Sequence, residues 1–303
     1  MTATIHLTWL EALTIGLVQG VSELFPVSSL AHSVLIPAWV GGAWADALDV
    51  SKPESPYLAF IVGLHVATAL ALIAYFWRDW IRIIGGFFTS IARREVRTSD
   101  QRLAWMLVLA TIPVGVVGLL GEHWFRVVFG KPTSAAAFLI VNGLVLLGIE
   151  YWARRTKTPQ TSYVDERVSG PISDERIAKM PMAHAVLIGS AQCLALLSGI
   201  SRSGITTAAG MLRGLSREDA TRFAFLLATP VIFAAGVLKL GDLFGPLGSG
   251  IRPQIVVGSV LSGVGAYIAV RFLARYVAHR SLRPFGVYCV VAGVASLVLF
   301  AVR

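Results

Sequence analysis

The chain has 303 residues, of which 55% are hydrophobic and only 14% are charged, and its mean hydropathy is +0.71. Because a soluble domain carries about 25% charged residues, this composition excludes an ordinary soluble protein and indicates lipid as the surrounding medium. The formal net charge is +9. Its basic residues lie in short segments between apolar runs and not on one amphipathic face, so the sequence predicts no nucleic-acid partner.

Six apolar runs are long enough to cross a bilayer as helices, which takes about 20 residues. They are approximately 57–77, 103–121, 133–149, 223–238, 253–270 and 284–302. The sequence therefore predicts an all-α, polytopic membrane protein with six transmembrane helices. Glu150 lies at the end of one of these runs, where we expect its carboxylate to be solvated at the membrane interface.

Two further apolar regions, about 9–39 and 181–212, are interrupted by polar residues, proline or glycine. Non-helical backbone at membrane depth persists only where protein or a water-filled cavity satisfies its polar groups. We therefore expect each region to form a re-entrant pair of short helices that enters and leaves on one side. A single kinked span is the alternative for each region.

The two broken regions resemble each other in sequence. Gly16, Gln19, Leu24 and Ser28 match Gly189, Gln192, Leu197 and Ser201 at one constant offset, and three spans follow each region. An odd number of crossings inverts the second copy, so we predict two inverted repeats with the site at mid-membrane. We expect a single integral membrane domain, 1–303, with repeats at about 8–152 and 181–303 and a cytoplasmic loop at about 153–180.

The basic residues gather in alternate connections. They are Arg78, Arg82, Arg93, Arg94, Arg97 and Arg102; Arg154, Arg155, Lys157, Arg167, Arg176 and Lys179; Arg213, Arg217 and Arg222; and Arg271, Arg275, Arg280 and Arg283. Because loops rich in Lys and Arg stay in the cytoplasm, both termini are predicted to lie outside. The first broken region then enters from outside and the second from the cytoplasm.

Arg202 is the strongest functional candidate, because an arginine at membrane depth costs roughly 3 kcal/mol on insertion scales. Its planar donors suit phosphate oxygens, and Gly204 allows the backbone the close approach that an anion site needs. Hydroxyls of Ser201, Ser203 and Thr206 stand beside it. The alternative is an arginine that extends from a helix end to the membrane surface.

Gln19 and Glu23 are four residues apart, so on a helix they share one face. A divalent cation, Mg²⁺ or Ca²⁺, bound by Gln19, Glu23, waters and phosphate oxygens would fit hard-cation chemistry. An ion pair between Glu23 and Arg202 is the alternative. His65, within a span, is a candidate for a supporting donor.

Ser28, Ser29 and His32 follow the proline break at Pro26. Ser29 and His32 are three residues apart, so one helical turn could bring the hydroxyl and the imidazole within reach. Phosphoryl transfer needs a nucleophile, a group that takes its proton, and positive charge. Either residue could attack, with the other or Glu23 managing the proton; a helix cap and a core histidine are the structural alternatives.

Two segments resemble the signature regions of the undecaprenyl pyrophosphate phosphatase, or bacitracin-resistance, family. They are QGVSELFPVSSLAH at 19–32 and SGISRSGITTAAGMLRGLSR at 198–217, and the similarity extends over nearly the whole chain. Three residues depart from the pattern. Ser198 replaces a proline, Ala31 replaces a glycine, and Gln19 is the neutral option, which weakens the metal proposal because an amide holds a cation less tightly than a carboxylate.

The resemblance implies a multi-pass enzyme of the bacterial plasma membrane that removes the terminal phosphate of an isoprenyl pyrophosphate lipid. This activity recycles the cell-wall carrier lipid and lowers sensitivity to bacitracin. It implies a divalent cation at Gln19 and Glu23 and a site open to the outer face. The implied catalytic residues are Glu23, Ser29, His32 and Arg202. The predicted substrate contacts are Ser28, Ser201, Ser203, Gly204 and Thr206.

Two other functions remain open from the residues alone. Inverted repeats with broken helices are typical of transporters, so the same pocket could bind a translocated lipid phosphate. A structural membrane subunit is disfavoured by the cost of burying Glu23, His32 and Arg202 in lipid. A homodimer is compatible with the sequence.

Overall fold

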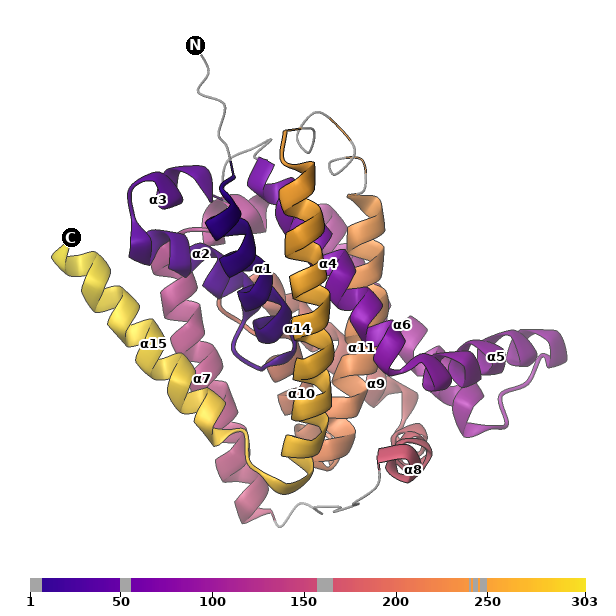
Figure 1. The fold of residues 1–303 in the computed structure, drawn as a ribbon. Coiled ribbons are helices and arrows are strands. Elements are labelled where there is room, and N and C mark those ends of the chain that lie inside the picture. Colours follow the sequence, from indigo (N-terminus) through magenta and orange to yellow (C-terminus); the bar gives the residue numbers. More distant parts are fainter. Residues whose placement is uncertain (1–6, 50–55, 157–165, 240, 242–244, 246–249) are drawn as a thin grey trace.

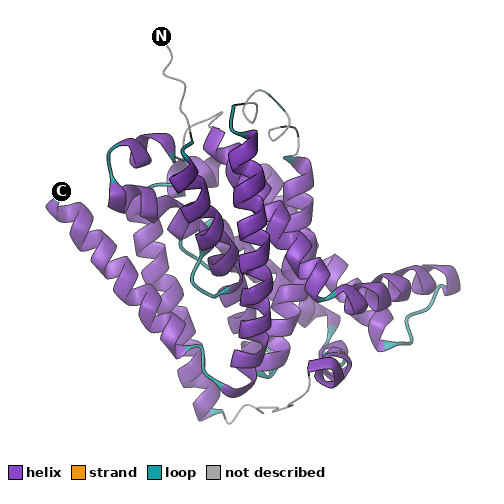
Figure 2. Cartoon of the chain, in the orientation of Figure 1, coloured by secondary structure: helices purple, strands orange, loops and turns teal. Residues whose placement is uncertain are grey.

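The computed structural model describes residues 7–303 except 50–55, 157–165, 240, 242–244 and 246–249. Within these described ranges the regular structure is entirely helical, which confirms the all-α prediction (Figure 2). The spanning helices stand side by side as a bundle, and the helices of the two broken regions lie among them (Figure 1).

All six predicted spans are confirmed as helices that are long and apolar enough to cross a membrane. They are α4 (Pro56–Tyr75), α6 (Ser99–Phe129), α7 (Pro132–Arg155), α11 (Arg217–Leu238), α14 (Arg252–His279) and α15 (Arg283–Val302). Several run past the predicted ends. Helix α14 continues through Arg271 and Arg275, because long basic side chains reach the aqueous boundary while their stems remain on apolar surface.

Each broken region forms a pair of short helices. The first consists of α1 (Trp9–Leu24) and α2 (Ser29–Val40). The second consists of α9 (Met182–Ala191), a 3₁₀ turn η1 (Gln192–Leu196) and α10 (Arg202–Leu212). At 1.5 Å per residue none of them reaches across a hydrocarbon core of about 30 Å. Helices α1 and α9 enter from opposite ends of the bundle (Figure 1); the inverted relationship between the two halves stays a prediction.

Backbone conformation explains both interruptions. Pro26 has no N–H to continue a helix, and Ser28 adopts a positive φ of 63°, which a non-glycine residue rarely does. Gly199 has φ 122°, and a Cβ there would lie 2.5 Å from that of Phe138. Glycine is therefore required at the second break, both by its backbone angle and by the space available.

Close backbone contact fixes α1 against α14. A Cβ on Gly16 would lie 2.7 Å from the carbonyl oxygen of Gly258, and one on Gly20 would lie 2.8 Å from the Cα of Ser262. Small residues of this kind allow helices in lipid to approach until their backbones touch. The contact sets the position of the α1 face that carries Gln19 and Glu23.

The start of α1 and the end of α15 lie at one end of the bundle, and the basic segments lie at the other (Figure 1). At one end, Gln254 donates to the carbonyl of Leu7 at 3.1 Å, and the final residue, Arg303, donates to the carbonyl of Ala38 at 3.1 Å. At the other end, Arg102 donates to the carbonyl of Met180 at 3.0 Å. The start of α1 and the end of the chain therefore share one face, opposite the basic connections.

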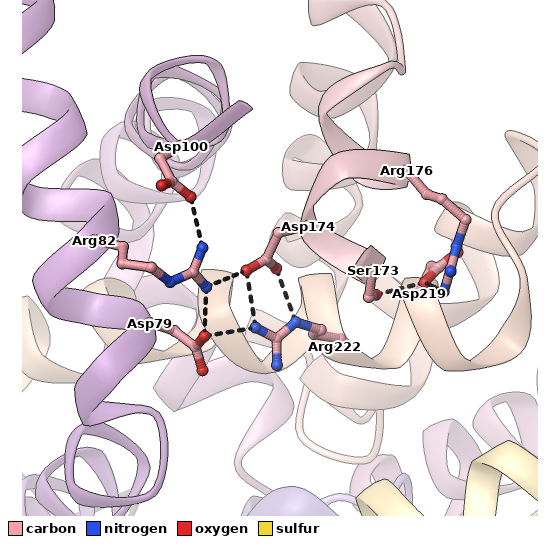
Figure 3. Close-up of polar contacts among 8 residues, drawn as sticks. All are labelled: Asp79, Arg82, Asp100, Ser173, Asp174, Arg176, Asp219 and Arg222. Atoms are coloured by element: carbon pink, nitrogen blue, oxygen red, sulfur yellow. Dashed lines mark hydrogen bonds and ion pairs between the residues drawn. The ribbon is translucent and has the colours of Figure 1, made fainter. Parts of the chain in front are cut away.

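Two predicted connections contain helices. Most of the segment 78–102 forms α5 (Trp77–Arg93), and α8 (Glu166–Ala178) lies within the predicted loop 153–180, of which 157–165 is outside the described residues. A network of charges joins these two helices to the bundle (Figure 3). Arg82 of α5 contacts Asp79, Asp100 and Asp174 at 2.6, 2.7 and 2.8 Å.

Arg222 of α11 completes this network with contacts of 2.8 Å to Asp174 and 3.0 Å to Asp79 (Figure 3). Burial lowers the pKa of Arg82, but its hydrogen bonds to Asp174 and Asp79 raise it more, so the net pKa is above its usual value. The guanidinium therefore stays charged, and α5, α6, α8 and α11 are tied together by charge-assisted bonds.

The prediction that Glu150 is solvated was wrong. Its side chain is fully buried, and its oxygens accept hydrogen bonds from Arg217 Nε at 2.7 Å and Nη2 at 2.9 Å. The backbone N–H of Leu282 also donates to it, at 2.9 Å. The Arg217 guanidinium and the Leu282 N–H compensate the carboxylate for the water it loses on burial. These bonds hold α7, α11 and the α14–α15 connection together.

Candidate active site

The two chain breaks are in contact inside the bundle, and a side chain of α7 joins them. Asn142 donates from Nδ2 to the carbonyl of Pro26 at 2.9 Å, and its Oδ1 accepts from the N–H of Ser201 at 3.0 Å. Both breaks leave backbone groups without a helical partner, and such groups are costly in an apolar interior. A single amide therefore satisfies one donor and one acceptor and fixes the two breaks relative to each other.

Glu23 is the centre of the first half of the site. Its Oε2 accepts from Ser29 Oγ at 2.5 Å and from Gln19 Nε2 at 2.8 Å, and the side chain is buried. Gln19 and Glu23 lie on one face of α1, as their spacing predicted, and Ser29 is the first residue of α2. The turn at Pro26 thus folds the start of α2 back onto the end of α1.

His65 of α4 also faces Glu23. Its Nε2 lies 3.5 Å from Glu23 Oε2, while its Nδ1 lies 2.9 Å from the carbonyl oxygen of Ile61. Because a carbonyl only accepts, Nδ1 carries a proton. The imidazole of His65 is therefore a third side chain at the carboxylate that Ser29 and Gln19 also contact.

The hydrogen bonds of the His32 ring go to groups other than the Ser29 hydroxyl. Its Nδ1 donates to the carbonyl of Ser28 at 2.8 Å, and its Nε2 accepts from the hydroxyl of Tyr288 at 2.7 Å. Both ring nitrogens are therefore engaged, and the hydroxyl of Ser29 bonds to Glu23 instead of to His32. A backbone angle such as that of Ser28 costs of order 1–3 kcal/mol, and the bond from His32 helps to hold it.

The second half of the site lies at the start of α10. Arg202 is its first residue, and the hydroxyl of Ser201 caps the helix by accepting from the N–H of Gly204 at 3.2 Å. Ser201 Oγ and Ser203 Oγ lie 3.1 Å apart. Free backbone N–H groups and the helix dipole favour an anion at such a helix start.

Two polar atoms on this helix are buried without a hydrogen-bond partner among the described residues: Nη1 of Arg202 and Oγ1 of Thr206. They are four positions apart and so share a face of α10. Arg202 is close enough to Glu23 for a Coulombic interaction, yet no direct ion pair joins them in the described structure. The alternative of a structural Glu23–Arg202 bridge is therefore not realised.

Sequence reasoning missed three residues of this region. Asn142 and Tyr288 were read as parts of apolar spans. A single amide in an apolar span nevertheless indicates a buried polar residue with a structural or functional role. Gln192 was noted only as the repeat partner of Gln19, yet it is buried and neither of its amide atoms has a partner among the described residues.

The arrangement combines a serine hydroxyl hydrogen-bonded to a carboxylate, a guanidinium whose Nη1 has no partner among the described residues, and a helix start. Such a set can activate an oxygen nucleophile and bind the anion that it attacks. The described residues contain no group of three or more His, Cys, Asp or Glu side chains placed for a metal ion. Gln19 Oε1, which is buried without a partner among those residues, is an additional oxygen that a cation could use.

Replacing Asn142 by leucine should destabilise the protein, because the Pro26 carbonyl and the Ser201 N–H would both lose their partner. Each buried group left unpaired costs about 1–3 kcal/mol. We expect a lower thermal unfolding temperature for purified Asn142→Leu in detergent. Val141→Leu, at an exposed neighbouring position of the same helix, is the matched control and should unfold like the wild type; equal unfolding temperatures for all three proteins would contradict the assignment.

Comparison with known proteins assigns the chain to a defined family. The family model described as "Bacitracin resistance protein BacA" matches residues 12–295. An undecaprenyl-diphosphatase of Mycolicibacterium paratuberculosis is 57% identical over 304 residues, which cover 99% of this chain and 100% of the relative. An undecaprenyl-diphosphatase 2 of Frankia alni is 47% identical, covering 98% and 99%.

A more distant relative gives the same result. An undecaprenyl-diphosphatase 2 of Burkholderia orbicola is 42% identical over 287 residues, covering 93% of this chain and 94% of the relative. The residues that the family model matches, 12–295, include nearly all of both broken regions and of the six spans. This chain therefore belongs to the BacA family of bacitracin resistance proteins.

Proposed function

We propose that this chain hydrolyses undecaprenyl diphosphate to undecaprenyl phosphate and inorganic phosphate at the junction of the two chain breaks. The observation that carries the proposal is Nη1 of Arg202, which is buried with no partner among the described residues and lies near a carboxylate that accepts a hydrogen bond from a serine hydroxyl. An anion with a transferable phosphoryl group would satisfy the guanidinium and meet the nucleophile. The full-length relatives named as undecaprenyl-diphosphatases supply the substrate class.

The first step is attack by Ser29 Oγ on the terminal phosphorus. The proton of the hydroxyl passes to Glu23 Oε2, which lies 2.5 Å away. The Ser29 Oγ–P bond forms, the bridging P–O bond breaks, and undecaprenyl phosphate leaves. Arg202, Thr206 and the start of α10 offset the charge on the transferring group, and electrostatic stabilisation of this kind supplies most of the acceleration in phosphoryl transfer.

The second step is hydrolysis of the phosphoserine. Glu23 first passes the proton from Ser29 to His65 Nε2 and then takes a proton from water. The water oxygen bonds to phosphorus, the Ser29 Oγ–P bond breaks to release inorganic phosphate, and Glu23 gives its new proton to Ser29 Oγ. His65 Nε2, 3.5 Å from Glu23, can exchange the proton that Glu23 holds between the two steps. His32 is a positioning residue, because its ring is hydrogen-bonded to the Ser28 carbonyl and to Tyr288 and so holds the turn before Ser29.

Gln19 and Glu23 fit a divalent cation only in part. They offer a carboxylate and the unpartnered Oε1 of the amide, and hard cations accept such oxygens together with phosphate and water. We propose that these two residues hold Mg²⁺ or Ca²⁺, which would supply positive charge to the diphosphate. One carboxylate and one amide make this a weak site when substrate is absent.

The surroundings of the site suggest how a lipid substrate reaches it. We place the chain in the bacterial plasma membrane with the basic end of the bundle in the cytoplasm and both termini outside. The first break is then approached from the outer face, and the isoprenyl chain remains in lipid beside the spans. The curated relatives are named for diphosphate hydrolysis, so the transporter alternative has no support among them.

Replacing Arg202 by alanine tests the proposed function. We expect purified Arg202→Ala to lose about 10²–10³-fold in kcat with undecaprenyl diphosphate, as for loss of one key donor to the transition state. Phosphate release is the measurement. Arg213→Ala, an exposed arginine just after the other end of α10, is the matched control and should keep its activity. Near wild-type turnover by Arg202→Ala would rule out the assignment.

The chemical stability of the trapped intermediate distinguishes Ser29 from His32 as the nucleophile. We expect acid quenching with substrate labelled in its terminal phosphate to leave label on the protein in an acid-stable, base-labile form, as for phosphoserine. Ser29→Ala should trap none, whereas His32→Ala should trap some at a reduced rate. An acid-labile, base-stable label that is lost in His32→Ala would make His32 the nucleophile.

The metal proposal predicts the effect of a second carboxylate. Chelator should abolish phosphate release by the wild type, and added Mg²⁺ or Ca²⁺ should restore it. Gln19→Glu should need less cation for half-maximal activity, because two carboxylates hold a hard cation more tightly than a carboxylate and an amide. Full activity in excess chelator, or an unchanged cation requirement in Gln19→Glu, would remove the cation from this site.

A further inference from the structure

Helix α5 carries an apolar stripe that the bundle does not cover. Its members recur every three or four positions, so they lie on one face of the helix. They are Trp77, Ile81, Ile84, Phe88 and Ile91, and each is between 50% and 64% exposed. Helix α5 extends sideways from the bundle at the end where α8 lies (Figure 1). A continuous row of exposed bulky apolar side chains such as this one marks an interaction site.

The opposite face of α5 packs on the start of α6. Gly86 lies against the backbone of Asp100, and Ser90 accepts a hydrogen bond from Trp105 Nε1 at 2.9 Å. Arg82 joins α5 to α6, α8 and α11 through the charge network (Figure 3). The helix is therefore held at a fixed angle to the bundle, with its apolar stripe facing outward.

Exposed arginines flank the stripe. Arg78 lies beside it, with its guanidinium 5.1 Å from the ring centre of Trp77, and Arg93, Arg94 and Arg97 follow at the end of the helix. Of these four arginines, only Arg97 is paired with an acid among the described residues, and its partner is Glu95. A helix with a bulky apolar face and clustered arginines is typical of one that lies in the boundary between lipid headgroups and acyl chains.

We propose that α5 lies in the plane of the membrane at the basic end of the bundle and binds anionic phospholipid headgroups through Arg78, Arg93, Arg94 and Arg97. The apolar stripe enters the acyl region, and the arginines meet lipid phosphates. A second copy of the chain is a poorer partner for this face, because pairing two stripes would bring two sets of arginines together. Each arginine near an anionic surface strengthens the attraction roughly fivefold.

Depth measurements on the full chain test this position. A spin label is attached at Phe88→Cys, on the stripe, or at Thr89→Cys, which is exposed on the neighbouring face, in a Cys193→Ala background that retains the buried Cys289. The protein is reconstituted into phosphatidylcholine vesicles with or without phosphatidylglycerol. The label at Phe88 should collide mainly with oxygen, which concentrates in acyl chains, and the label at Thr89 mainly with a water-soluble nickel chelate.

The charge arm of the experiment tests the choice of lipid. Phosphatidylglycerol should move the label at Phe88 deeper into the bilayer. The triple variant Arg93→Gln/Arg94→Gln/Arg97→Gln should need several-fold more phosphatidylglycerol for the same change in depth. Arg271→Gln/Arg280→Gln, which removes exposed charge elsewhere at the basic end, should respond like the parent. A Phe88 label open to the nickel chelate, no response to phosphatidylglycerol, or dipolar broadening between labels of two copies would each overturn the proposal.

Discussion

The bridge from Asn142 to both chain breaks is the interaction on which the site depends. Each break releases backbone groups from helical hydrogen bonds at a depth where water does not replace them. Asn142 supplies a donor to the Pro26 carbonyl and an acceptor to the Ser201 N–H, so one side chain of α7 satisfies a group from each break. Ser29 and Arg202 each lie within three residues of a backbone group that Asn142 binds. The two hydrogen bonds of Asn142 therefore also set the distance between Ser29 and Arg202.

The rest of the structure supports this junction by close packing and by charge. Glycines of α1 bring its backbone against α14 and so place Glu23, while the buried Glu150–Arg217 pair fixes α7, which carries Asn142, to α11. His32 holds the unusual backbone angle of Ser28 through the carbonyl of that residue. The strained turn is thus stabilised by side chains from its own helix and from α15, as is common where strain orients a functional group.

Much of the architecture was predictable, because a chain with long apolar runs and few charged residues can fold in a membrane in only a few ways. The six spans follow from the length of the apolar runs, and the two broken pairs follow from interruptions such as Pro26, Gly199 and Arg202. The partners of buried polar groups were not predictable, because they come from distant segments: Asn142 is 116 residues from Pro26 and Tyr288 is 256 from His32. For the same reason Glu150 was assigned to solvent, and helix α5 was read as a basic loop although its apolar stripe is visible in the sequence.

The separation of Glu23 from Arg202 has a functional meaning that an ion pair would not have. A direct bridge would neutralise both groups, and the substrate would have to break it before either could act. In the structure Glu23 accepts hydrogen bonds from Ser29 and Gln19, whereas Arg202 keeps a buried donor that has no partner among the described residues. In the proposed mechanism an incoming anion satisfies that donor, so binding of the diphosphate and its alignment with the serine hydroxyl become one event. The short helices allow this arrangement because each ends inside the membrane, where its first or last residues can face the junction.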